Sequence, residues 1–353
     1  IPRIDYTDST EGALLLEPSR TNSITYSNDF SKSIYGKINL TITANQGISL
    51  DGTQNANLLV PNAAVGNRYL SNSVGSNLKI NTVFLKKKEL RYVNVGNAAS
   101  VVVVDLENGT ISSNSVSTNN FTIENYRNGW YRVSCYNTSS TNYQIQVFFG
   151  VDGSGSNIAT NGTDGVYIYG FEIQNGSYPT SYIPTNGSTV QRAAETCNDS
   201  GNSEVFNDSQ GVLFANISYP ITSVGSGNKR IAISDTTSSN RVMFAEIGNT
   251  GFSALITSSG SNSAYITGDV NNLLSLKTAV KYKQNDFALW INGFEVGTDT
   301  SGNTPNGLSK FAFDGGDGGN DFYGKTKEIG YYDTALTDAE LETLTSYRSL
   351  NEM

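Results

Sequence analysis

The residues best suited to metal chemistry lie in one glycine-rich stretch, Asp314-Gly315-Gly316-Asp317-Gly318-Gly319-Asn320-Asp321. Calcium is a hard cation that takes several carboxylate and carbonyl oxygens, and glycines let the backbone approach such an ion closely. Asp314, Asp317 and Asp321 are therefore candidate calcium ligands. The stretch lacks the spacing and the final Glu of an EF-hand loop. The alternative is a polar turn whose Asp side chains accept hydrogen bonds from their own backbone.

Catalytic combinations of residues are difficult to assemble from this chain. It contains no histidine, which excludes a Ser-His-Asp triad and a histidine general base. A glycosidase needs two carboxyl groups flanking the scissile bond, but the Glu-x-Asp-x-x-Glu strand of sandwich-fold glucanases is absent. Asp338, Glu340 and Glu342 are close together, yet they fall in a stretch with helical spacing. A polysaccharide lyase that uses Tyr and His lacks its histidine. We therefore expect a protein that is not an enzyme.

Aromatic and polar residues crowd together in two stretches that raise the question of sugar binding. Residues 129–136 read Gly-Trp-Tyr-Arg-Val-Ser-Cys-Tyr, and residues 178–184 read Tyr-Pro-Thr-Ser-Tyr-Ile-Pro. Sugar rings stack on exposed Tyr or Trp, while amide and charged groups bind the hydroxyls. In a strand, however, Trp130 and Tyr131 point to opposite faces, so one of them must point inward. We expect Trp130 to be a core residue.

The second stretch is better explained as a strap that closes a sandwich. Pro179 and Pro184 prevent it from continuing as a regular strand, and we expect Tyr178 and Tyr182 to pack onto the sandwich. For direct contact with a glycan we name Arg68 and Tyr69, in a predicted loop, as candidate ligand-binding residues.

The composition favours strands over helices. Charged residues make up 16% of the 353 residues, too few for the solvated faces of a helical bundle. Asn, Ser, Thr and Gly are abundant, which is typical of short strands joined by polar turns. The net charge of −9 argues against a nucleic-acid partner, because phosphate contacts need clustered Lys and Arg. No apolar run is long enough to span a membrane.

The two cysteines, Cys135 and Cys197, provide neither a disulfide framework nor a zinc site. Cys135 alternates with strand residues and is expected to be a buried thiol.

Period-two alternation predicts strands along most of the chain. Asn108-Gly109 predicts a two-residue hairpin between residues 101–106 and a strand at Ile111, and Asn292-Gly293 predicts another hairpin. Near the end, Thr337-Asp338-Ala339-Glu340 is a capping box and predicts one short helix.

The predicted fold class is all-β, with two tandem β-sandwich (jelly-roll) domains and one short C-terminal helix. We expect an extended lead-in over residues 1–22, a sandwich over 23–190, a polar linker over 191–210 and a second sandwich with the helix over 211–353. The chain begins at Ile1 rather than Met, so we expect further sequence upstream.

Several motifs resemble a family of bacteriophage tail and fibre structural proteins. Those in the first half occupy residues 2–6, 14–22, 26–30, 51–56, 129–134 and 170–185. The second half resembles the laminin-G/concanavalin-like sandwich often attached to such proteins, through residues 280–283, 287–293, 322–325 and 335–341. One departure is Tyr35, where relatives more often have Trp.

The resemblance implies a carbohydrate-binding-module-like jelly roll and an external virion location, on a tail or fibre. It leads us to expect a tail-fibre or tail-associated adhesin that binds host surface glycans, joined to other virion proteins through its upstream region. By family analogy the protein would be a homo-oligomer, as a trimer. The alternative is a purely structural virion protein, such as a head fibre, decoration protein or baseplate-region spacer. Solvent-facing aromatics in a groove would favour the adhesin, and buried aromatics would favour the spacer.

Overall fold

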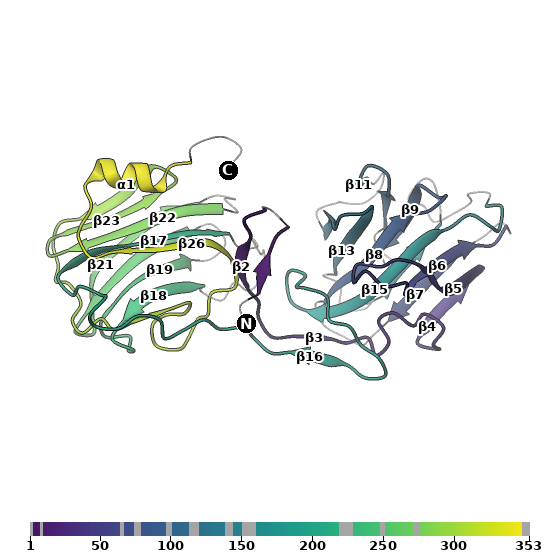
Figure 1. Cartoon of the computed structure of the whole chain (residues 1–353), viewed down its shortest axis with the longest axis horizontal. Coiled ribbons are helices and arrows are strands. Elements are labelled where there is room, and N and C mark those ends of the chain that lie inside the picture. The colour runs from purple at the N-terminus through teal and green to yellow at the C-terminus, as the bar shows by residue number, and fades with distance from the viewer. Residues whose placement is uncertain are drawn as a thin grey trace. The chain divides into compact units, whose positions relative to one another are not determined.

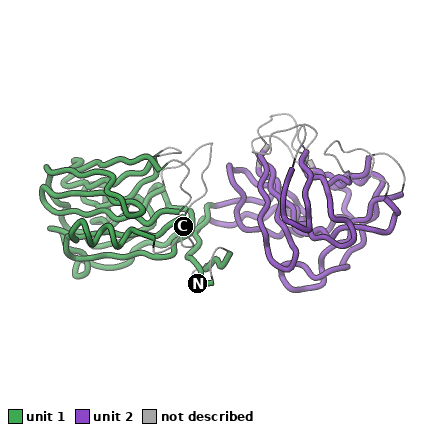
Figure 2. The backbone as a smooth tube through the Cα atoms, turned by 90° about the horizontal axis from the view of Figure 1, so that it is seen from above, with its two compact units in different colours: residues 1–18, 194–353 green, residues 19–193 purple. Residues whose placement is uncertain are grey.

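The computed structural model describes residues 3–7, 10–63, 67–73, 79–96, 101–112, 120–137, 144–149, 160–218, 229–247, 251–270 and 275–347. The chain divides into two compact units, coloured in Figure 2. The inserted unit is Ser19–Ala193, and the terminal unit combines Ile1–Pro18 with Ala194–Met353. Both are built almost entirely of antiparallel strands (Figure 1), as the composition predicts.

The inserted unit is a sandwich of two six-stranded sheets. Sheet I has the order β11 (Thr110–Ser112), β10 (Val101–Asp105), β9 (Tyr92–Gly96), β14 (Gln144–Phe148), β7 (Tyr69–Ser73) and β4 (Tyr35–Ile38). Sheet II has the order β12 (Phe121–Asn125), β13 (Trp130–Asn137), β8 (Lys79–Lys87), β15 (Val166–Asn175), β6 (Ala56–Pro61) and β5 (Leu40–Gly47). A separate ladder joins β3 (Arg20–Asn22) to β16 (Val190–Arg192).

The core of the inserted unit lies between these sheets and follows from strand alternation. Val93, Val95 and Val147 of sheet I face Val133 and Cys135 of sheet II, and all five are buried. Tyr131 lies on the same inward face of β13, whereas Trp130 and Arg132 point to the outer face. The predicted division of β13 into two faces is therefore confirmed. Burial raises the pKa of the Cys135 thiol to about 12, as expected for an inert buried cysteine.

The terminal unit is the second sandwich. Sheet III has the order β1 (Ile4–Asp5), β2 (Ala13–Leu16), β26 (Gly324–Tyr332), β17 (Gln210–Ser218), β22 (Ser275–Lys283), β23 (Asp286–Ile291) and β24 (Phe294–Asp299). Sheet IV has the order β21 (Ser261–Asp269), β20 (Gly251–Ser258), β19 (Arg241–Ile247), β18 (Arg230–Ser234) and β25 (Lys310–Ala312). Phenylalanine, leucine and isoleucine side chains from both sheets fill the space between them.

The predicted C-terminal helix is confirmed as α1 (Asp338–Thr345), and its N-terminus has the predicted capping box. The Thr337 side chain accepts a hydrogen bond from the Glu340 amide, and the Glu340 carboxylate accepts one from the Thr337 amide. In the described part of the chain, no helix is long and apolar enough to cross a membrane.

The unit boundaries differ from the expected ones at the start of the chain. β2 pairs with β26, so that Leu14 lies opposite Thr326, and this part of the expected lead-in belongs to sheet III. The next strand, β3, pairs with β16 and belongs to the inserted unit. Part of the expected linker also packs on the terminal unit, because Phe206 is buried in its core. The inserted unit is thus contained within the sequence of the terminal unit.

The hairpin at Asn108-Gly109 forms, but its connection has a different length from the predicted one. Asp105 pairs with Thr110, which leaves four residues between the strands rather than two. Asp105 Oδ1 accepts hydrogen bonds from the amides of Glu107 and Asn108, and these bonds stabilise the longer turn. The hairpin at Asn292-Gly293 has the predicted two-residue connection, since Ile291 pairs with Phe294.

Candidate functional site

A sandwich can bind a ligand on a sheet face only where that face is not already covered. The outer face of sheet III is covered by α1. Leu341 of the helix is buried against Phe214, Ala288 and Trp290 of the sheet. This face therefore has a structural role. Lys281 Nζ lies 2.7 Å from Asp286 Oδ1 of the sheet and 3.7 Å from Asp338 Oδ1 of the helix, so these two carboxylates are paired with a cation.

The outer face of sheet IV is buried over its central strands, where Ala232, Met243 and Leu255 pack together. The glycine-rich stretch of residues 314–321 lies against this face. Arg241 Nη1 donates a 2.7 Å hydrogen bond to the carbonyl of Gly315, and Ser234 Oγ donates a 2.8 Å bond to the carbonyl of Gly316. A Cβ atom at Gly316 would lie 2.7 Å from the Ser234 Cβ, which explains why a glycine is needed there.

The three aspartates of this stretch, named above as calcium ligands, are engaged in different contacts. Asp314 accepts a bond from the Gly316 amide, Asp317 lies 3.5 Å from Arg241, and Asp321 accepts a 2.8 Å bond from the Tyr323 hydroxyl. Burial, followed by the charges of the other two aspartates, raises the pKa of Asp314. Among the described residues, no group of three or more acidic, Cys or His side chains could hold a metal ion. Calcium binding here stays a prediction, and the contacts match the turn alternative.

The outer face of sheet II is covered at one end by the loop between β5 and β6. Trp130 is 1% exposed beneath this loop, and its Nε1 donates a 3.1 Å hydrogen bond to the carbonyl of Ile48. Its ring contacts that of Tyr169 edge to face. The prediction that Trp130 is buried is confirmed, although it packs outside sheet II rather than between the sheets.

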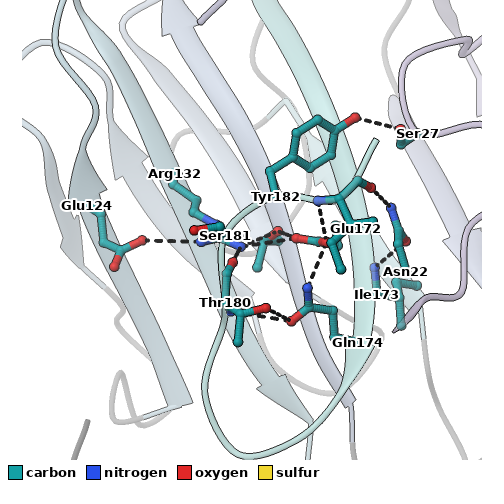
Figure 3. Close-up of polar contacts among 12 residues, drawn as sticks. Asn22, Ser27, Glu124, Arg132, Glu172, Ile173, Gln174, Thr180, Ser181 and Tyr182 are labelled. Atoms are coloured by element: carbon teal, nitrogen blue, oxygen red, sulfur yellow. Dashed lines mark hydrogen bonds and ion pairs between the residues drawn. The ribbon is translucent and has the colours of Figure 1, made fainter. Parts of the chain in front are cut away.

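The rest of this face lies under the strap, here defined as residues 176–185. Figure 3 shows the polar contacts that hold it. Arg132 Nη2 donates to Glu172 Oε2 at 3.1 Å and to the carbonyl of Thr180 at 2.6 Å. Glu172 Oε1 accepts from the amide of Ile183 at 2.9 Å and from Gln174 Nε2 at 2.8 Å. These bonds link the strap to β13 and β15.

Two further residues complete the attachment of the strap. Asn22 Nδ2 donates a 2.8 Å bond to the carbonyl of Ile183, and its oxygen accepts bonds from the amides of Ile24 and Ile173. The Tyr182 hydroxyl donates to Ser27 Oγ, and the ring packs on Phe84 and Tyr169. The structural interpretation of residues 178–184 agrees with these contacts.

Glu172 and Arg132 are 0% and 2% exposed, respectively, so neither can meet a ligand in solution. Burial is the largest influence on Glu172 and raises its pKa to about 7, against the lowering effects of Arg132 and of the hydrogen bonds from Ile183 and Gln174. A carboxyl group with a shifted pKa can mark a catalytic site, but here every group that bonds Glu172 belongs to the strap or to sheet II. We interpret this cluster as a structural latch.

The outer face of sheet I is unevenly buried. Tyr69 and Phe148 on this face remain partly exposed, whereas Ser71, Asn94 and Gln146 are buried. Alternation places Ile38, Tyr69, Phe148, Asn94 and Val103 side by side on that face, one from each of five adjacent strands.

An aromatic pair lies at the centre of this row. The rings of Tyr69 and Phe148 have centroids 5.6 Å apart and planes inclined by 53°, and both residues remain partly exposed. Tyr92, on the same face of β9, is 40% exposed. Rings in this position offer the apolar surface on which a sugar ring can stack.

Polar side chains adjoin the aromatic pair. Asn94 lies directly opposite Phe148 in the β14–β9 register and is fully buried. Among the described residues it has no hydrogen-bond partner for either its amide nitrogen or its oxygen. Ser71 and Gln146, which face each other one step along the neighbouring strands, are nearly buried on the same face. Buried amides normally have partners, so Asn94 stands out, but at 0% exposure it lies beneath the surface that a ligand would meet.

The charged residues of this face lie at its rim, where β9 begins and β10 ends. Arg91 forms two hydrogen bonds with Asp105, from Nε to Oδ1 at 2.9 Å and from Nη2 to Oδ2 at 2.7 Å. The guanidinium also lies 5.0 Å from the centroid of the Tyr92 ring. The hydrogen bond from Arg91 is the main cause that holds the pKa of Asp105 well below its usual range.

Of the two residues named from sequence as glycan contacts, one lies on this face. Tyr69 belongs to β7 rather than to a loop, and it forms the aromatic pair. Arg68 is 1% exposed and donates a 3.0 Å bond to Thr160 Oγ1, so it has a structural role. Sequence reasoning missed Phe148. The alternation of residues 144–149 could have indicated that Phe148 points outward, but nothing in the sequence pairs it with Tyr69.

A polar hollow of about 510 Å³ lies elsewhere, on the terminal unit. Its lining residues are Ser, Asn and Gly of residues 258–263 and 301–303. The exposed aromatics of the same unit, such as Tyr265 and Phe294, are not among them. The hollow therefore offers hydroxyl and amide groups without a stacking surface.

Comparison with known proteins gives no family assignment. No family model matches the chain, and no curated protein matches it. Solved structures with some similarity include a CBM40 module of the Ruminococcus gnavus IT-sialidase bound to alpha2,3 sialyllactose, with a TM-score of 0.35 and 14% identity over 43% of this chain and 97% of that one. A SAP-like pentraxin from Limulus polyphemus has a TM-score of 0.34 and 13% identity over 44% and 76% of the two chains. Domains LG4-5 of the mouse laminin alpha1 chain have a TM-score of 0.26 and 8% identity over 96% and 95%. At these TM-scores the similarities carry no argument about function.

Proposed function

We propose that this chain is a non-catalytic glycan-binding protein and that its binding surface is the outer face of sheet I. The observation that carries the proposal is the partly exposed Tyr69–Phe148 pair, with Tyr92 on the same face 40% exposed. Exposed ring faces match the C–H surface of a saccharide. The latch offers no such surface, because Glu172 is 0% exposed and already accepts bonds on both oxygens.

The biological setting of the proposal is an external virion protein of a bacteriophage, acting as a tail-fibre or tail-associated adhesin toward host surface glycans. This part rests on the resemblance of the sequence motifs alone, as do the homo-oligomeric state and the attachment to other virion proteins. The absence of an enzymatic role is likewise part of the proposal.

A purely structural virion protein is the second candidate, and one observation favours it. The most motif-rich segments, around Arg132 and residues 170–185, build the latch, and both tryptophans are buried. The residues that carry the resemblance thus stabilise the fold, and binding depends on residues outside those motifs.

Binding of the whole chain to a panel of bacterial surface polysaccharides tests the proposal. We expect saturable binding that Phe148→Ala weakens at least tenfold. Tyr265→Ala is the matched control, because Tyr265 is an aromatic residue with 54% exposure on the other unit. Binding by wild type that Phe148→Ala leaves unchanged would place the site elsewhere, and no binding to any member of a panel that includes the host polysaccharide would favour the structural candidate.

A further inference from the structure

We propose that the outer face of sheet I selects uncharged glycans and that Asp105 is the residue that enforces this selection. The inference rests on the proposed function and concerns the same face. Its basis is that Arg91, which lies beside Tyr92 on this face, is already paired with a carboxylate.

The Arg91–Asp105 pair is held in a fixed geometry. Both Asp105 oxygens accept from the guanidinium. The same carboxylate accepts from the amides of Glu107 and Asn108 and from Asn108 Nδ2, so it cannot swing away from the rim. The turn of four residues between β10 and β11 therefore positions the anion that occupies Arg91.

The next charges along the rim are paired as well. Lys87 Nζ lies 3.0 Å from Glu107 Oε2, and Arg91 Nε lies 3.7 Å from the same carboxylate. The two cations Lys87 and Arg91 are thus paired with the two anions Asp105 and Glu107 at this rim. Elsewhere on the face, the side chains that alternation turns outward are aromatic, aliphatic, amide or hydroxyl groups, among them Tyr69, Ser71 and Gln146.

The sequences of the connections in the inserted unit are also poor in charged residues. Residues 64–66, 74–78, 97–100, 113–119, 138–143 and 150–159 contain one charged residue, Asp152, which is an anion. The whole chain has a net charge of −9. An acidic sugar is bound most effectively by a free guanidinium in a bidentate pair, and neither the described face nor these connections supply one.

The inference makes Asp105 a specificity-determining residue. Replacement by Asn keeps an oxygen that can accept the turn amides, but it removes the negative charge that holds Arg91. The released guanidinium would then be available to a sugar carboxylate beside Tyr92. Glu107→Gln is the matched control, because it removes one negative charge two residues away without breaking the bidentate pair.

An array of matched glycans tests this inference, with each neutral oligosaccharide printed beside its counterpart that carries uronic or sialic acid. Wild-type protein should bind neutral members, with an affinity that changes less than twofold between low and high salt. Asp105→Asn should gain about tenfold toward acidic members, and Glu107→Gln should not. A salt-sensitive preference of wild type for acidic members would overturn the inference alone. Absence of binding to either set would overturn the proposed function together with it.

Discussion

Arg132 and Glu172 form an ion pair, with 3.1 Å between Nη2 and Oε2, at the point where the strap crosses sheet II. The same Nη2 also reaches the carbonyl of Thr180, and the same carboxylate reaches the amide of Ile183. One buried pair therefore attaches the strap at two places.

Removal of the cation from this pair should strongly destabilise the inserted unit. Arg132→Met leaves Glu172 buried without its counter-charge. Loss of one partner of a buried ion pair typically lowers the free energy of unfolding by about 3–5 kcal/mol. Calorimetric unfolding of the whole chain should show one transition shifted to lower temperature and the other unchanged. The control is Glu124→Gln, because Glu124 lies 3.9 Å from Arg132 and is 45% exposed; equal shifts for both variants would contradict the latch.

The stability of the inserted unit should fall as the pH rises through neutrality. The pKa of Glu172 is raised from an ordinary value of 4.5 to about 7 in the folded chain. The folded state therefore binds a proton more tightly than the unfolded state, so its stabilising contribution is complete below about pH 4.5 and is lost as the pH approaches 7. The loss amounts to about 1.4 kcal/mol per pH unit within that window.

Glu172→Gln provides the comparison for this pH dependence. The variant keeps the size of the side chain and cannot titrate, so its midpoint of urea unfolding should vary less between pH 5 and pH 7 than that of wild type. Identical pH profiles for the two proteins would show that Glu172 does not titrate in this range.

Asn94→Ala should have only a small effect on stability. Because neither amide atom has a described partner, loss of the side chain should cost little beyond the cavity it leaves. Asn22→Ala is the opposite case, since the Asn22 side chain bonds the strap and its loss should lower stability. A large destabilisation by Asn94→Ala would indicate a structural role for this amide.

Calcium should have little effect on the terminal unit. The carbonyls of Gly315 and Gly316 and the carboxylate of Asp321 already have protein donors. The melting temperature in about 1 mM calcium should therefore equal that in EDTA. A rise of several degrees that Asp321→Asn removes would support the calcium site that the sequence suggests.

Residues 19–193 should fold when expressed alone. The unit has its own core, and the β3–β16 ladder holds its two ends together, with Arg20 opposite Arg192. A cooperative melting transition that matches one transition of the whole chain would confirm independence. An unfolded fragment would show that the unit depends on its surroundings.

Local sequence patterns predict the strands and the helix well, because alternation and the capping box at Thr337 are local signals. They do not predict that Leu14 pairs with Thr326, since pairing between distant strands depends on which edge remains free once the sandwich is assembled. Arg132 and Glu172 look in sequence like ordinary exposed strand residues, and their burial follows from the strap above them. Tyr69 as a glycan contact stays a prediction. Its partner Phe148 comes from a strand some 80 residues later, and only the sheet brings the two rings together.

The insertion of one unit into the other determines how the chain would respond to mechanical tension. Both chain ends belong to the terminal unit, where β2 is bonded along β26. A pull applied between the ends therefore loads sheet III first and reaches the inserted unit only after that pairing fails. A ligand that pulls on the inserted unit instead distributes its load over two covalent connections, at Pro18 and Ala194. The inserted unit therefore carries little of a force applied between the chain ends, and a force applied to the unit itself is shared by its two connections.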